Sequence, residues 1–186
     1  MEQIFQIHSL TILILTFCKD FLSVSMSLKQ LTFEFEELSG DGDLNLQNLE
    51  LLNKARAITS NAYAPYSKFF VGAAALLSNK KIITATNQEN ASFPAGICAE
   101  RVLLSAVTSL HKDIAIHTIA ISYKKKSGES DSPISPCGIC RQSLVEFENR
   151  FKSPVRLILS GQQGKVFILG SASFLLPLSF GSKDLG

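Results

Sequence analysis

The chain reads SPCGICRQ at residues 135–142 and GICAER at residues 96–101, and these two stretches decide its interpretation. The first places Cys137 and Cys140 at positions i and i+3 of a helix start. Those positions face the same side of a helix, so both sulfurs can reach one ion. Cys98 is predicted to lie at the start of another helix, where free N–H groups and the helix dipole favour a thiolate.

Three thiolates and one open position are what a catalytic zinc site needs, whereas a closed structural site needs a fourth protein ligand. The remaining cysteine, Cys18, lies in an N-terminal segment of different character and is a poor candidate for that ligand. None of the three histidines has metal-ligand spacing; they are His8, His111 and His117. We therefore predict one Zn²⁺ per subunit, held by Cys98, Cys137 and Cys140.

Glu100 follows the first cysteine by two residues and is predicted to lean toward the open metal position without binding the ion. Zinc lowers the pKa of bound water from about 16 toward neutrality. A neighbouring carboxylate can take that proton and deliver it to a ring nitrogen and a leaving amine. Arg101 lies on the same helical face as Cys98 and can offset the negative charge of the thiolates by hydrogen bonding to the sulfurs.

The overall composition favours a compact protein without a nucleic-acid polymer or a membrane as partner. The 186 residues are 46% hydrophobic and 18% charged, with a formal net charge of +2. Polymer binding usually requires a basic excess on one face, and the lysines at 124–126 are typical of a solvated loop. The apolar run at residues 10–17 is shorter than the roughly 20 residues that span a bilayer.

The N-terminal segment differs from the rest of the chain. It has no basic residue before Lys19 and no small-residue cleavage site, so it does not match a signal peptide. We predict that residues 1–25 are a non-native or disordered extension, which the intact mass of the naturally expressed protein would test. Because a secreted scaffold would be richer in cysteine, we expect a reducing compartment and a cytoplasmic location.

Hydrophobic periodicity predicts an α/β fold with a mixed sheet and helices on its faces. Apolar residues recur at helical spacing over residues 46–59, and Asp43 or Asn45 can cap that helix. The predicted helices cover residues 46–59, 97–110 and 136–150, the last with Ser135 as cap and Pro136 as first residue. The predicted strands cover residues 69–77, 82–85, 114–122, 155–160 and 166–169.

With these motifs the chain resembles the cytidine deaminase family, in its small form with three cysteine ligands. Cys-Ala-Glu at one helix start and Pro-Cys-x-x-Cys at another match the signature of zinc nucleobase deaminases. The resemblance extends from residue 63 to the end of the chain and includes YAPYSKFFVGAA (63–74), NQEN (87–90) and LLPLSFG (175–181). It implies a three-layer α-β-α sandwich with a five-stranded sheet, formed as a single domain by residues 26–186.

The resemblance also implies the residues that bind substrate. Those matching Asn87 and Glu89 hydrogen-bond the ribose 3′-hydroxyl, and Phe69 matches an aromatic that packs on the pyrimidine ring. The backbone at Ala99 reads the polar edge of the base together with Glu100. Phe180 matches an aromatic that reaches a neighbouring subunit, and the small family members are homotetramers.

The motifs and the resemblance together lead to the hypothesis that the protein catalyses zinc-dependent hydrolytic deamination of cytidine and deoxycytidine, a reaction of pyrimidine salvage. One alternative is a deaminase for another amino-pyrimidine nucleoside, such as blasticidin S. A second is a zinc-stabilised binding protein without turnover, against which Glu100 beside an open metal position argues. A third is a thiol-disulfide enzyme that uses Cys137 and Cys140.

Overall fold

The computed structural model describes residues 27–186, so the predicted extension at residues 1–25 lies outside the described part. Short 3₁₀ turns, labelled η, connect several of the regular elements. In chain order the elements are β1 (Glu36–Leu38), α2 (Leu46–Ile58), η1 (Thr59–Asn61), β2 (Phe69–Leu77), β3 (Ile82–Thr86), η2 (Phe93–Ala95), α3 (Ala99–Leu110), β4 (Ile116–Lys125), α4 (Gly138–Phe151), β5 (Arg156–Ser160), β6 (Val166–Leu169), η3 (Ala172–Leu175) and η4 (Ser182–Asp184).

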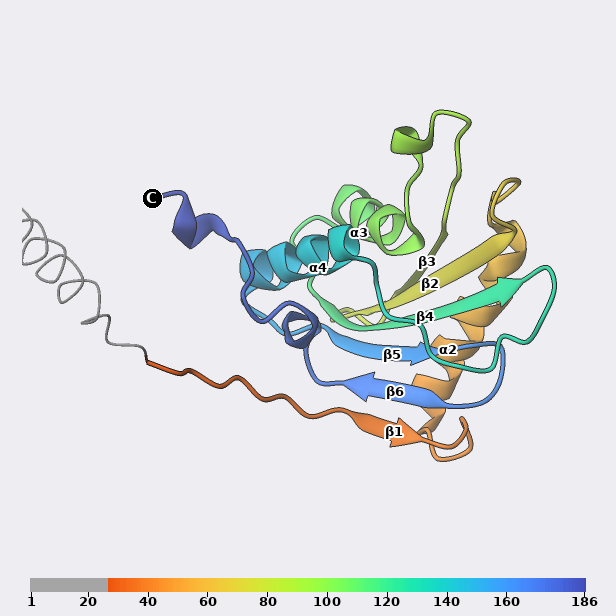
Figure 1. The fold of residues 1–186 in the computed structure, drawn as a ribbon, viewed down its shortest axis with the longest axis horizontal. Coiled ribbons are helices and arrows are strands. Elements are labelled where there is room, and N and C mark those ends of the chain that lie inside the picture. The colour runs from red at the N-terminus through yellow and green to blue at the C-terminus, as the bar shows by residue number, and fades with distance from the viewer. Residues whose placement is uncertain (1–26) are drawn as a thin grey trace, which may run out of the picture. The chain divides into compact units, whose positions relative to one another are not determined.

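Six strands form one mixed sheet in the order β1-β6-β5-β4-β2-β3 (Figure 1). Neighbouring strands are antiparallel except β4 and β5, which are parallel. The predicted number of five strands is wrong, because β1 pairs with β6 and extends the sheet. Three residues are too few for a recognisable alternation. Side chains outside the strand help to hold it, since the ring centroids of Phe35 and Phe167 lie 4.9 Å apart.

Helices cover both faces of the sheet, as the predicted three-layer α-β-α sandwich requires. Figure 1 shows α3 and α4 together on one face and α2 on the other. Alternate residues of β2 serve the two layers: Ala73 and Ala75 pack in the core beneath α3 and α4, and Ala74 and Leu76 pack beneath α2. Both helices that carry the cysteines therefore lie on the same face.

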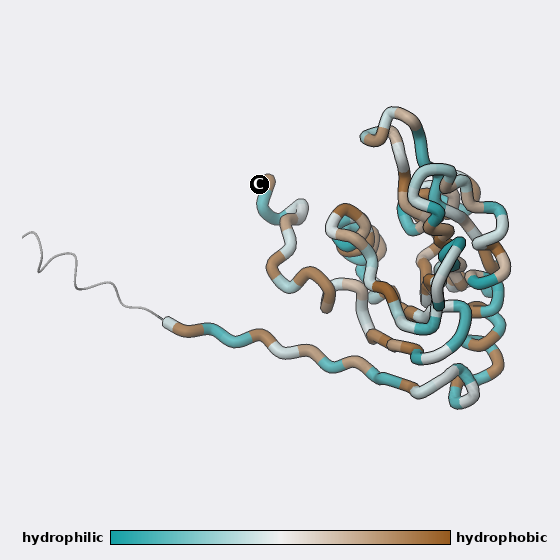
Figure 2. Tube along the Cα trace, turned by 45° about the vertical axis from the view of Figure 1, so that its right-hand side comes forward, coloured by the Kyte–Doolittle hydropathy of each residue, from teal (hydrophilic) through white to brown (hydrophobic). Residues whose placement is uncertain are grey.

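Beyond β6 the chain passes through η3 into a largely hydrophobic C-terminal stretch (Figure 2). Leu178 and Phe180 in this stretch are exposed. Within residues 27–186, no helix is both long and apolar enough to cross a membrane.

Arg56, in the last turn of α2, connects three parts of the fold. Its Nε donates to the carbonyl oxygen of Gly161 at 3.0 Å, and its Nη2 donates to the Ser160 hydroxyl at 3.3 Å. Its Nη1 forms an ion pair with Asp41 at 2.5 Å. The hydrogen bond from Arg56 holds the pKa of Asp41 below its usual value of 3.8.

Replacing Asp41 with asparagine is expected to reduce the free energy of unfolding by about 0.5–1 kcal/mol at pH 7, because the carboxylate is partly exposed and partly screened. A lowered pKa means that the stabilisation is complete above the usual value and is lost as the pH falls through the lowered one. The difference between parent and variant should therefore shrink below pH 3.8. Urea unfolding at several pH values measures it, with Asp43→Asn, at an exposed neighbouring position, as control. An equal loss at every pH would contradict the ion-pair explanation.

Candidate metal centre and active site

Cys98 and Cys137 occupy equivalent positions, each as the N-cap of a helix. The carbonyl oxygen of Cys98 accepts from the N–H of Val102 at 3.1 Å, and that of Cys137 accepts from the N–H of Arg141 at 2.9 Å. The predicted cap at Ser135 is therefore wrong, since α4 begins two residues later than expected, at Gly138. Cys137 keeps an extended backbone, with φ −67° and ψ 168°, while its carbonyl already accepts the first helical bond.

The three predicted cysteines converge. The Sγ atoms of Cys98 and Cys137 are 3.7 Å apart, and those of Cys137 and Cys140 are 3.4 Å apart. All three sulfurs lie within 4.8 Å of one another, and none is in a disulfide. Ligands about 2.3 Å from a tetrahedral zinc ion stand about 3.8 Å from each other, so the spacing and the soft donor atoms fit such an ion. Among residues 27–186, this is the one cluster of its kind.

The thiols do not ionise equally. Hydrogen bonds from the Cys140 and Cys137 thiols, helped by the charge of Arg101, lower the pKa of Cys98 to about 6. The pKa of Cys140 is raised, because its thiol donates to Cys98 and is buried. Cys98 is therefore more readily ionised than Cys140, and a positive ion bound between the sulfurs would favour the thiolate form of its ligands.

Glu100 lies in the first turn of α3, two residues after the Cys98 ligand position, and only 5% of it is exposed. Burial raises the pKa of its carboxyl group, and the negative charge of Cys98 acts in the same direction. A carboxyl group with a raised pKa is suited to accept and return a proton near neutral pH. The cysteine cluster consists of Cys98, Cys137 and Cys140, and the role of Glu100 as a proton carrier that does not bind the metal stays a prediction.

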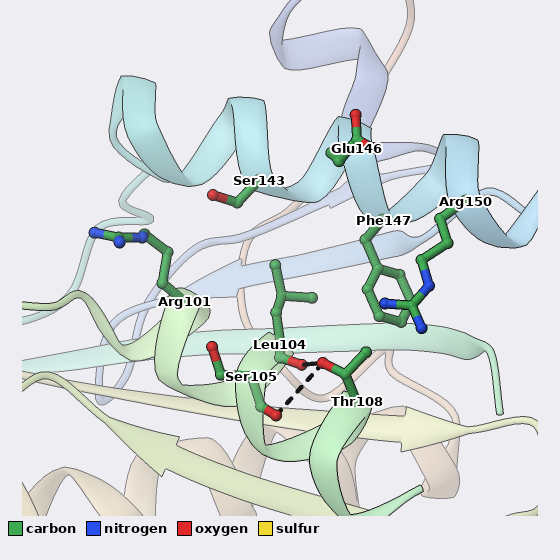
Figure 3. A pocket seen from close by; sticks show the side chains of 8 residues that line it. All are labelled: Arg101, Leu104, Ser105, Thr108, Ser143, Glu146, Phe147 and Arg150. Atoms are coloured by element: carbon green, nitrogen blue, oxygen red, sulfur yellow. Dashed lines mark hydrogen bonds between the residues drawn. The ribbon is translucent and has the colours of Figure 1, made fainter. Parts of the chain in front are cut away.

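Arg101 is half-buried, and its side chain lines a cavity of about 260 Å³ between α3 and α4 (Figure 3). Figure 3 shows Ser105 and Thr108 on the α3 side of this cavity and Ser143 and Glu146 on the α4 side. The cysteines do not line it, so the cavity is separate from the sulfur cluster. The charge of Arg101 acts on Cys98, while the predicted hydrogen bond to the sulfurs stays a prediction.

The Asn87 side chain holds the first residues of β2, and the Glu89 side chain holds the loop before that strand. The Asn87 side chain accepts from the N–H of Val71 at 2.8 Å and donates to the carbonyl oxygen of Phe69 at 2.9 Å. The Glu89 carboxylate accepts from the N–H of Tyr66 at 2.8 Å. Hydrogen bonds from the residues Ser67 and Tyr66 lower its pKa and keep it charged.

Of the predicted substrate-binding residues, Glu89 lines a hollow of about 330 Å³, whereas Phe69, Asn87, Ala99 and Phe180 do not. Its lining consists of Tyr66, Ser67, Glu89, Asn90, Phe93 and Gly96. One face of Phe69 stacks on Tyr123, with ring centroids 4.9 Å apart. Ala99 is fully buried as the first residue of α3, where a backbone N–H lacks a partner within its own helix.

Phe180 stands apart from the other predicted substrate contacts. Its ring is 58% exposed, and its carbonyl oxygen accepts from the Gln142 side chain at 2.9 Å. The described hydrogen bonds and ring contacts do not join it to Phe69, Asn87 or Glu89.

One further residue, the buried carboxylate Glu148, was missed by the sequence reasoning. A charged residue at a buried position of an amphipathic helix was the available signal.

Comparison with known proteins decides the family. Residues 46–153 match the cytidine and deoxycytidylate deaminase zinc-binding region. The chain belongs to this family. A cytidine deaminase of Halalkalibacterium halodurans is 32% identical over 136 residues, which are 73% of this chain and 95% of that protein. A cytidine deaminase of Mycoplasma genitalium is 39% identical over 55% of this chain and 75% of that protein.

Solved structures of the cytidine deaminase family share the fold. The cytidine deaminase of Burkholderia pseudomallei superposes with a TM-score of 0.61 and 35% identity, over 70% of this chain and 97% of that one. The enzyme of Mycobacterium tuberculosis gives a TM-score of 0.57 and 27% identity, over 74% and 99%. The chain is thus an enzyme of the cytidine deaminase family, and its cysteine cluster lies in the zinc-binding region that defines the family.

Proposed function

We propose that this protein catalyses the hydrolytic deamination of cytidine and deoxycytidine to uridine and deoxyuridine. The observation that carries the proposal is the convergence of three free thiols beside a buried glutamate of raised pKa. The Sγ atom of Cys137 lies 3.7 Å from that of Cys98 and 3.4 Å from that of Cys140. Relatives that bear the name cytidine deaminase, at 32–39% identity, support the same substrate.

In this proposal Cys98, Cys137 and Cys140 hold one Zn²⁺ per subunit. When bound, the metal supplies an activated water as nucleophile for C4 of the base. Glu100 takes a proton from that water, delivers it to N3, and returns a second proton to the departing amine. Water and cytidine are consumed and uridine and ammonia are formed, so the reaction needs no other reactant.

The surroundings of Glu100 suit a free nucleoside. In this proposal the backbone N–H of Ala99 and the Glu100 carboxylate read the polar edge of the base, and the face of Phe69 not stacked on Tyr123 packs on the ring. Asn87 and Glu89 can add a ribose 3′-hydroxyl to their backbone partners, because carbonyl and carboxylate oxygens each accept more than one hydrogen bond. In a nucleic acid this 3′-hydroxyl is esterified to phosphate and cannot form the same hydrogen bonds, so the free nucleoside is favoured as substrate.

We further propose that the active form is a homotetramer in which Phe180 enters the site of a neighbouring subunit. The exposed ring of Phe180 and its neighbour Leu178, 88% exposed, support an apolar contact with another copy. The three free thiols are compatible with a reducing, cytoplasmic location.

Turnover of cytidine and deoxycytidine, followed by ultraviolet absorbance and ammonia release, tests the proposal on zinc-loaded protein. Turnover of both, with one zinc per chain, is the expected result. No turnover of either by zinc-loaded protein would overturn it, and blasticidin S would then be the next substrate to test. Zinc-free protein that reduces disulfides would favour the thiol-disulfide alternative.

A further inference from the structure

Glu148, in the C-terminal half of α4, is a buried carboxylate with no part in the proposed reaction. Its Oε1 accepts from the N–H of Val155 at 2.7 Å and from the N–H of Ala172 at 2.9 Å. Its Oε2 accepts from the N–H of Ser173 at 3.2 Å, and the Ser171 hydroxyl reaches both oxygens, at 2.9 and 3.0 Å. No ion pair to it is found among residues 27–186. Backbone and hydroxyl donors therefore stabilise a carboxylate that burial would otherwise destabilise.

Three of these donors belong to residues 171–173, where the chain enters η3. Ser171 is the N-cap of this turn, and the free N–H groups of its first residues point at the carboxylate. A glutamate on α4 thus completes the start of a turn that is 24 residues away in sequence. Replacing it would leave buried N–H groups without an acceptor.

The same helix holds the continuation of this segment. Arg141 donates to the carbonyl oxygen of Leu175 at 3.2 Å, and Gln142 donates to that of Phe180 at 2.9 Å. Arg141 and Glu148 are seven residues apart, two helical turns, and so lie on the same side of α4. The helix α4, which bears Cys140 in its first turn, therefore holds the C-terminal segment at two places. Arg141 and Gln142 hold it near the start of the helix, and Glu148 holds it near the end.

We propose that Glu148 is a positioning residue that sets the path of residues 171–180 and through it the placement of Phe180 for substrate binding. The consequence for substrate rests on the proposed function, whereas the consequence for the segment does not. The hydrogen bonds of Glu148 go to Val155 and residues 171–173 and not to Glu100 or the cysteines, so its effect should fall on KM more than on kcat.

The variant Glu148→Gln keeps the shape of the side chain but offers one acceptor oxygen where two now accept, and its amide NH₂ would face N–H donors. Hydrogen exchange of residues 171–180 should speed up, while that of residues 138–142 stays unchanged. The KM for cytidine should rise about three- to tenfold, as expected when one aromatic contact is lost, with kcat within about threefold. Glu129→Gln, at an exposed loop position, is the matched control.

A double-mutant cycle with Phe180→Ala separates positioning from general stability. If Glu148 acts through Phe180, adding Glu148→Gln to Phe180→Ala raises KM no further. A further rise of equal size in that background, or a lowered Tm with unchanged KM, would overturn the proposal. Unchanged hydrogen exchange of residues 171–180 in Glu148→Gln would overturn the positioning role, whatever the substrate of the protein. Failure of the parent to deaminate cytidine would reject only the proposed substrate. If Glu148→Gln fails to fold, Ser171→Ala removes one donor and should produce the same changes on a smaller scale.

Discussion

Replacing Glu100 with glutamine is expected to lower kcat for cytidine by about 10⁴-fold, since in the proposed mechanism one side chain performs both proton transfers. Glutamine fills the same buried volume, 5% exposed, so the fold and the cysteine cluster should persist. An amide cannot accept and return a proton as a carboxyl group can, and burial of Glu100 raises the pKa of its carboxyl group, which favours this role. Zinc content should remain one per chain, because the sulfurs alone form the metal cluster.

The measurement is kcat per bound zinc, with Glu129→Gln as the control for loss of an exposed carboxylate. KM should change less than kcat, because a glutamine amide can still hydrogen-bond the polar edge of the base, whereas the proton transfers of the transition state are lost. A variant that binds zinc and keeps activity within about tenfold of the parent would show that another group carries the protons. A variant that loses zinc would instead show that Glu100 supports the metal centre.

The metal centre was predictable because its information is local. Two cysteines at i and i+3, and a third followed by Ala-Glu, predict ligands and a proton carrier without knowledge of the sheet. The spacing brings Cys137 and Cys140 to one side of α4, and the fold brings Cys98 to them. The predicted start of α4 is two residues too early. Serine followed by proline is typical of an N-cap and a first helical residue, but Cys137 is the N-cap in the structure.

Contacts between distant segments were beyond the sequence. The strand β1 has three residues and is recognisable only when β6 lies beside it. The hydrogen bonds of Asn87 to residues 69 and 71, and those of Glu148 to residues 171–173, join parts of the chain 16–25 residues apart. The resemblance to the family suggests a ribose role for Asn87, but its role in holding the start of β2 emerges only from these contacts.

Replacing Gly72 with alanine is expected to destabilise the protein strongly, although alanine normally suits a strand better than glycine. A Cβ at this position would lie 2.1 Å from the carbonyl oxygen of Ala55 and 2.7 Å from Cγ2 of Ile58. Both atoms belong to α2, which packs directly on the backbone of β2. A side chain could rotate away, but a helix carbonyl cannot move without displacing the helix, so we expect a loss of about 3 kcal/mol in the free energy of unfolding.

For a chain of this size, that loss corresponds to a Tm lower by about 6–12 °C. Gly40→Ala is the matched control, since no atom lies within 4 Å of a Cβ built there, and its Tm should stay within about 2 °C of the parent. Gly72 also adjoins Val71, whose N–H and carbonyl oxygen both bond Asn87. A shift of β2 away from α2 should therefore also weaken substrate binding, and KM should rise in any Gly72→Ala protein that folds. An unchanged Tm would mean that α2 can move outward at little cost, and the close approach of this helix to β2 would then not be what requires glycine at position 72.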